Sequence, residues 1–177
     1  MTMASTAWGS VSIDTTDAPW LVNISPVVAI TPIPGAWVSS AKWVGTSAAD
    51  GSTGVAPGDY VFTLAIGGYA NGPGTFALNY SGDNNVVWSI DGGGTLSGAT
   101  SCTSGTCFTS LFVLSGTYGA NSVLTATVTN LPPGTNPMGL LVTGGTATSA
   151  SEVPEPSTYA MVAIGAAAVF ISRFRRA

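Results

Sequence analysis

Short stretches of alternating larger and smaller residues, each closed by a turn, constrain the fold of this 177-residue chain more than any other feature. Each stretch is bounded by Gly, Asn, Asp or Pro, as in Asn71-Gly72-Pro73-Gly74 and Pro132-Pro133-Gly134. The strands predicted in this way cover 59–66, 75–80, 85–90, 108–114, 122–129 and 139–143. Short strands of high β-propensity at such spacing are typical of an antiparallel β-sandwich or jelly roll. We therefore expect an all-β domain over residues 1–143.

The two ends of this domain are less regular. Prolines interrupt the first 45 residues, at Pro19, Pro26, Pro32 and Pro34. Because proline cannot donate to a strand ladder, we expect edge strands and loops that wrap the sandwich. After it, residues 144–152 are mostly small and polar, and we expect a flexible linker there.

The last 25 residues, 153–177, have three parts. Prolines stiffen Val153-Pro154-Glu155-Pro156, residues 157–172 carry no charge, and Arg173, Arg175 and Arg176 close the chain. Sixteen residues at ~1.5 Å rise cover ~24 Å, which is less than the ~30 Å of the hydrocarbon core. Snorkelling arginines and local thinning of the bilayer could close this gap. We expect a single transmembrane helix, with the arginines kept cytoplasmic by the positive-inside rule. A buried amphipathic helix is the alternative, but the run is apolar all round.

The tail resembles a PEP-CTERM sorting signal, with Pro-Glu-Pro, apolar helix and Arg-rich end in the right order. That resemblance implies an exosortase partner, a membrane-embedded cysteine protease-transpeptidase of Gram-negative bacteria that make extracellular polysaccharide. The chain would be anchored in the inner membrane, processed near Val153 to Pro156, and passed to the cell surface or the extracellular matrix. Such proteins need an N-terminal export signal, yet Met1 to Ser10 has neither a basic residue nor an apolar run. We favour a start that lies upstream; the alternative is a near-mature form.

Charge excludes one class of partner. Residues 1–151 contain one basic residue, Lys42, and six aspartates, which gives a net charge of −5. A protein that binds nucleic acid needs Lys and Arg against the phosphates, so we expect no nucleic-acid partner.

The two cysteines are close together, in Cys102-Thr103-Ser104-Gly105-Thr106-Cys107. An even number at short spacing in an exported chain predicts a disulfide. The alternative is a metal site, but with two thiols and no histidine a zinc ion would lack ligands.

The body is similar to a galactose-binding-like β-sandwich found among exported proteins with this tail. The segments that carry the resemblance are Asp17-Ala18-Pro19-Trp20, Trp37, Ala41-Lys42-Trp43-Val44, 83–88, 121–124, 128–130 and 139–142. The usual Asn-Gly turn after the central strand is here Asp91-Gly92-Gly93-Gly94, a change that bears on any ligand-binding role.

Residues able to do chemistry are few, so we expect no enzyme and no catalytic residue. The chain has no histidine, and no glutamate precedes Glu152. Asp83 and Asp91 flank one strand and would have to converge for hydrolysis, although aspartate beside glycine is more often a turn former. No cofactor is expected beyond a possible structural calcium at Asp14, Asp17 and Asp83, whose carboxylates are hard oxygen ligands.

Tryptophans are the remaining indication of a ligand. Trp88 lies on an alternating strand and is expected in the core, whereas Trp20, Trp37 and Trp43 fall in the irregular N-terminal part. An exposed tryptophan among these three would stack on a sugar ring. The leading prediction is a non-catalytic exported surface or matrix protein. A carbohydrate-binding module acting on extracellular polysaccharide is the alternative, and a surface hydrolase is a remote one.

Overall fold

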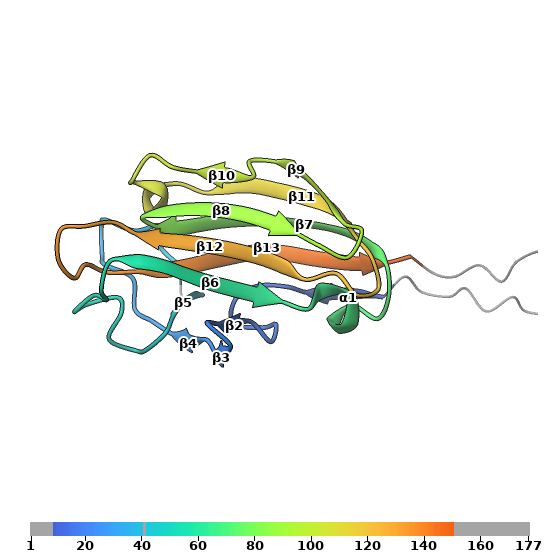
Figure 1. Ribbon diagram of the computed structural model, residues 1–177, viewed down its shortest axis with the longest axis horizontal. Helices are drawn as coiled ribbons and strands as arrows, with labels where there is room; N and C mark the ends of the chain where they lie inside the picture. The colour runs from blue at the N-terminus through green and yellow to red at the C-terminus, as the bar shows by residue number, and fades with distance from the viewer. Residues whose placement is uncertain (1–8, 41, 151–177) are drawn as a thin grey trace, which may run out of the picture.

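The computed structural model describes residues 9–40 and 42–150 (Figure 1). The predicted transmembrane helix and the sorting signal lie outside these ranges. Within them, no helix combines the length and the apolar character that crossing a bilayer requires. The strands of the described ranges form two antiparallel sheets, and in Figure 1 β8, β12 and β6 lie in front of β7 and β13.

The larger sheet has seven strands in the described structure, in the order β4-β5-β13-β7-β11-β9, with β1 also paired to β13. Its strands are β1 (Ser10–Ser12), β4 (Val28–Ala29), β5 (Trp43–Gly45), β7 (Gly74–Asp83), β9 (Thr95–Gly98), β11 (Phe112–Tyr118) and β13 (Gly139–Ser149). The first and last strands are neighbours, with Ser10 opposite Thr148, so the described chain begins and ends on the same side of the molecule (Figure 1).

The smaller sheet has six strands in the described ranges, in the order β10-β8-β12-β6-β2-β3. They are β2 (Leu21–Val22), β3 (Ser25–Pro26), β6 (Gly58–Leu64), β8 (Asn85–Ile90), β10 (Ser101–Cys102) and β12 (Leu124–Asn130). Two short helical turns, α1 (Ile66–Tyr69) and η1 (Cys107–Thr109), complete the elements.

The main core lies between the sheets because the strands alternate buried and outward-facing residues. In β12 every second residue from Leu124 to Asn130 is buried, while the threonines between them are partly exposed. Phe62, Leu78 and Leu114 are among the fully or almost fully buried side chains that fill the space. Alternation of this kind is what a sheet with one buried face requires.

A second, smaller hydrophobic cluster lies on the outer side of the larger sheet. Leu140 and Val142 belong to the main core, and Leu141 between them belongs to this cluster, with Trp43, Trp37 and Ile30. Since successive side chains of a strand point to opposite faces, Leu141 points outward. Segment 30–38 covers it: Ile30 N donates to the Trp43 carbonyl at 2.9 Å, and Trp43 Nε1 donates to the Val38 carbonyl at 2.8 Å.

The sandwich and its short N-terminal edge strands confirm the sequence-based predictions, and two element assignments need correction. Residues 144–149, predicted as linker, continue β13 and pair with β1 and β7, and a bulge between Thr143 and Thr146 accommodates the glycine pair. The strand predicted from Phe108 begins at Phe112, because residues 107–109 form η1 next to the disulfide. Strands β9 (Thr-Leu-Ser-Gly) and β10 (Ser-Cys) were not predicted, since they are short and contain few residues of high β-propensity.

Candidate functional site

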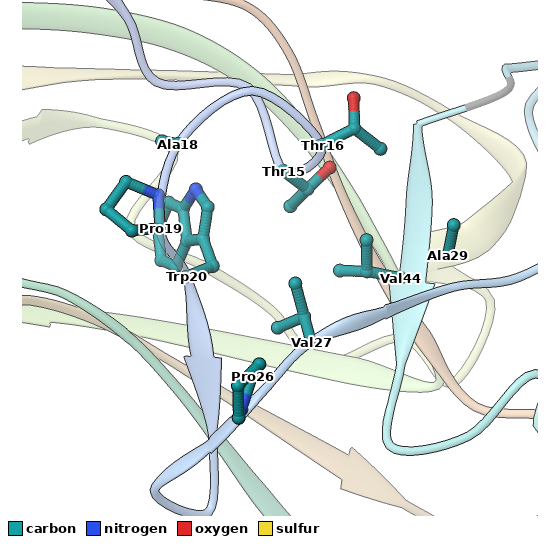
Figure 2. Close-up of a pocket in the computed structure, with 9 residues that line it drawn as sticks. All are labelled: Thr15, Thr16, Ala18, Pro19, Trp20, Pro26, Val27, Ala29 and Val44. Carbon is teal, nitrogen blue, oxygen red and sulfur yellow. The ribbon is translucent and has the colours of Figure 1, made fainter.

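Two chain segments cross the same open edge of the sandwich and leave a pocket between them. Residues 13–20 lead from β1 in the larger sheet to β2 in the smaller, and Val27 leads back from β3 to β4. The Val27 amide donates to the Trp20 carbonyl at 3.4 Å and ties the crossings together. The pocket has a volume of about 330 Å³. It is lined by Thr15, Thr16, Ala18, Pro19, Trp20, Pro26, Val27, Ala29 and Val44 (Figure 2).

Hydrogen bonds hold the first crossing in place. Thr15 Oγ1 donates to the Lys42 carbonyl and accepts from the Val142 amide at 3.2 Å. Trp20 Nε1 donates to the Ile13 carbonyl at 3.0 Å. Thr16 Oγ1 donates to Asp17 Oδ1 at 3.3 Å. All three hydrogen-bonding side chains that line the pocket from this crossing therefore already have partners, and proline, valine and alanine side chains make up the rest of the wall.

An ion-pair cluster stands beside the pocket. Lys42 Nζ lies 2.5 Å from Asp14 Oδ2 and 2.9 Å from Asp17 Oδ2. The hydrogen bond from Lys42 lowers the pKa of the Asp17 carboxyl, and the bond to Asp14 raises the pKa of the Lys42 ammonium. Asp14 Oδ1 also accepts from the Gly145 amide at 2.6 Å, so this carboxylate fastens the first crossing to the bulge of β13.

The predicted calcium site is not formed. Asp14 and Asp17 bind Lys42, and Asp83 lies at the end of β7 against Trp37. In the described ranges no group of three or more His, Cys, Asp or Glu side chains could hold a metal ion. The reason is that Lys42, far away in sequence, reaches the two N-terminal carboxylates in the folded chain.

The prediction of an exposed tryptophan is wrong for all three candidates. Trp20, Trp37 and Trp43 are 2%, 6% and 0% exposed. Trp20 borders the pocket but packs edge-on against Trp88, with ring centroids 6.1 Å apart, and Trp37 and Trp43 pack together at 4.4 Å in the second cluster. The prediction that Trp88 lies in the core is confirmed. None of these rings offers a face on which a sugar could stack.

Asp83 and Asp91 do not converge. Strand β8 lies between them, and six extended residues span ~20 Å, whereas the carboxyl pairs of glycosidases are about 5–9.5 Å apart. Asp91 begins a turn, in which the Gly94 amide donates to its carbonyl at 3.3 Å, and its side chain accepts from the distant Val123 amide at 2.8 Å. Asp83 is 4% exposed, and burial raises the pKa of its carboxyl to about 7, against the opposing effect of hydrogen bonds from Trp37 and Asn84.

The predicted disulfide between Cys102 and Cys107 is confirmed. It joins β10 to η1, and Ser81 Oγ on β7 donates to the Cys107 carbonyl at 2.7 Å. The bridge therefore connects an edge of the smaller sheet to the outer side of the larger one.

Sequence reasoning missed Asp50, which is 1% exposed. Its Oδ2 accepts from Thr46 N at 2.5 Å, Thr46 Oγ1 at 2.7 Å and Ser47 N at 3.0 Å, which makes it a structural anchor of the loop after β5. The Thr46-Ser47 pair three to four residues before an aspartate is the signal that could have indicated it. No local signal indicates the pocket, because segments from both sheets build it.

Comparison with known proteins matches the tail alone. A family model described as the PEP-CTERM protein-sorting motif matches residues 152–176, which include the Pro-Glu-Pro site and all three terminal arginines. No curated protein and no solved structure matches the chain, so the galactose-binding-like resemblance of the body is not confirmed. The chain thus carries a PEP-CTERM protein-sorting motif, which supports export and sorting by an exosortase.

Proposed function

We propose that this chain is a non-catalytic protein of the cell surface or extracellular matrix, sorted by an exosortase that processes it near Val153 to Pro156. The observation that carries the proposal is the sorting motif at residues 152–176, directly behind a folded β-sandwich. The precursor is anchored in the inner membrane by residues 157–172, with Arg173, Arg175 and Arg176 on the cytoplasmic side.

The chemistry of the body supports a structural role. The chain has no histidine, and the one pair of aspartates considered for hydrolysis lies at opposite ends of β8. Asp14 and Asp17 are bound to Lys42, and the pocket beside them is walled mainly by proline, valine and alanine side chains. These features leave a β-sandwich that carries few charged residues.

The test is the intact mass of the protein recovered from the membranes and medium of its host, with and without the exosortase. We expect a form shortened near Pro156 that disappears when the enzyme is deleted. A Pro154→Ala/Pro156→Ala variant should accumulate at full length, and Pro34→Ala, at an exposed proline more than 100 positions before the motif in the sequence, should be processed normally. A full-length membrane form in the parent strain, indifferent to the enzyme, would refute the proposal.

The carbohydrate-binding alternative loses the aromatic platform on which it was predicted, since Trp20, Trp37 and Trp43 are buried. A carbohydrate contact on this sandwich therefore needs a different surface.

A further inference from the structure

The outer side of the larger sheet is divided into a covered and an open part. At one end Leu141 and Trp43 lie under segment 30–38, and Ser81 is bonded to η1. Toward the other end, where β1 pairs with β13, the residues that face outward on β7, β9 and β11 include Thr75, Thr95 and Thr117, all exposed. The two parts therefore present different chemistry to solvent.

Strand register arranges the open part into two rows that cross five strands, β1, β13, β7, β11 and β9. One row is Ser10, Thr148, Thr75, Thr117 and Thr95. The next is Ser12, Thr146, Ala77, Ser115 and Ser97. The side chains of a row stand next to one another, as the 2.8 Å hydrogen bond between Thr95 Oγ1 and Thr117 Oγ1 shows. We call these ten positions the hydroxyl face; nine of them are Ser or Thr.

The hydroxyl face contains no charged and no aromatic residue, and at its β1 edge the Ser12 hydroxyl is already used, since it donates to Asp17 Oδ2 at 3.0 Å. The one basic residue of segment 1–151, Lys42, is already bound to Asp14 and Asp17. A polyanion would thus meet a body of net charge −5 without a free cation, which disfavours acidic polysaccharides and nucleic acids alike. Charge complementarity leaves a neutral partner.

The spacing of the hydroxyl groups and the area of the hydroxyl face narrow the choice of a neutral partner further. Neighbouring hydroxyls recur at ~4.8 Å across the strands and ~6.8 Å along them, so the ten positions with their margins cover roughly 400 Å². A stable dimer needs about 800 Å² from each copy, twice what this face offers. A thin, hydroxylated polymer chain needs much less and can follow the twist of the sheet.

We propose that the hydroxyl face binds neutral polysaccharide chains. This inference rests on the proposed function for its setting, because only a protein delivered to the surface or matrix meets such polymers. Each hydroxyl contact replaces one with water and contributes little, while the threonine methyl groups add some apolar burial. A single face therefore binds weakly, and retention on a dense polymer comes from repeated engagement along the chains.

The full chain in detergent micelles is passed over beads carrying a neutral glucan, a neutral mannan, a neutral galactan or the acidic polymer alginate. The face variant is Ser97→Glu/Thr117→Glu. The control is Ser89→Glu/Thr127→Glu, which adds the same charge to the outer side of β8 and β12 in the smaller sheet. We expect retention of the parent on at least one neutral polymer, loss of at least tenfold in the face variant, and little change in the control.

A second measurement uses the parent protein alone and needs no variant. Val113 is 61% exposed on β11 in the row next to the hydroxyl face, and Val87 is 47% exposed on the outer side of the smaller sheet. Hydroxyl-radical footprinting of the parent with the retained polymer should protect Val113 and leave Val87 reactive.

Four results would overturn the inference: no retention on any neutral polymer, stronger retention on alginate, equal loss in both variants, or protection of Val87 instead of Val113. Self-association that the face variant abolishes would make a second copy the occupant and would also overturn it. None of these results involves the exosortase, so failure here leaves the processing test untouched, and failure of processing leaves the bead assay readable.

Discussion

Replacing Asp83 with asparagine should remove a pH-dependent loss of stability from the sandwich. The Asp83 carboxyl ends β7 opposite Gly139 of β13, next to the second hydrophobic cluster, and it is 4% exposed. Hydrogen bonds from Trp37 and Asn84 oppose the effect of burial, but desolvation dominates and raises its pKa to about 7. Lys42, the one lysine in the chain, is bound to Asp14 and Asp17, so it does not compensate the Asp83 charge.

The magnitude follows from proton linkage. The pKa of this carboxyl rises from 3.8 in the unfolded chain to about 7 in the folded one, so between these values the folded state binds the extra proton. Stability is full below pH 3.8, falls as pH rises through this window, and levels off above pH 7. A difference of about three pKa units at 1.36 kcal/mol per unit gives a loss of about 4 kcal/mol.

The assay is urea unfolding of the parent and of Asp83→Asn at intervals from pH 4 to pH 8, with the disulfide kept oxidised. Asparagine keeps an oxygen acceptor for Trp37 and carries no charge, so we expect a nearly flat profile in this window. The variant should match the parent near pH 4 and exceed its free energy of unfolding by up to about 4 kcal/mol at pH 8. Parallel pH profiles for the two proteins would show that the Asp83 carboxyl is not the source of the pH dependence.

Three further changes test other parts of the structure. Cys102→Ser/Cys107→Ser opens a loop of about six residues and should lower the free energy of unfolding by about 2 kcal/mol in urea titrations. A loss above about 4 kcal/mol would contradict the idea that the disulfide stabilises the protein mainly by closing this short loop. Trp20→Ala should cost about 3–5 kcal/mol because the indole is buried against Trp88, and a loss below 1 kcal/mol would mean that the ring is exposed in solution. Ile24→Gly should raise the melting temperature, with a gain of about 0.5–1 kcal/mol, because Ile24 is 93% exposed at φ 67° in the hairpin between β2 and β3; an unchanged or lower melting temperature would count against strain there.

The local sequence pattern was enough to predict most of the long strands of the sandwich. β8 occupies the predicted residues 85–90, and β6, β7 and β12 lie within a few residues of their predicted bounds. These strands were predicted correctly because each alternates buried and outward-facing positions and ends at turn residues. The disulfide was predictable for a similar reason, since its two cysteines are five positions apart.

The local sequence pattern failed to predict the structure of segments that depend on contacts with residues distant in sequence. Residues 144–149 have the composition of a linker, and they form a strand because β1 and β7 supply hydrogen-bonding partners on both sides. Trp37 and Trp43 follow no strand alternation that would place them, and segment 30–38 buries them against Leu141 on the outer side of the sheet. Burial of this kind depends on which segments meet in space.

The sorting motif, the all-β class and the disulfide could be predicted from the sequence, because each depends on residues that are close together along the chain. Which side chains meet across the sandwich became clear from the folded chain. It bound Lys42 to Asp14 and Asp17 where a calcium site was predicted, buried the tryptophans, and aligned serines and threonines from five strands on one face. Strand register and chain crossing bring together residues far apart in sequence, and local composition does not specify those pairings.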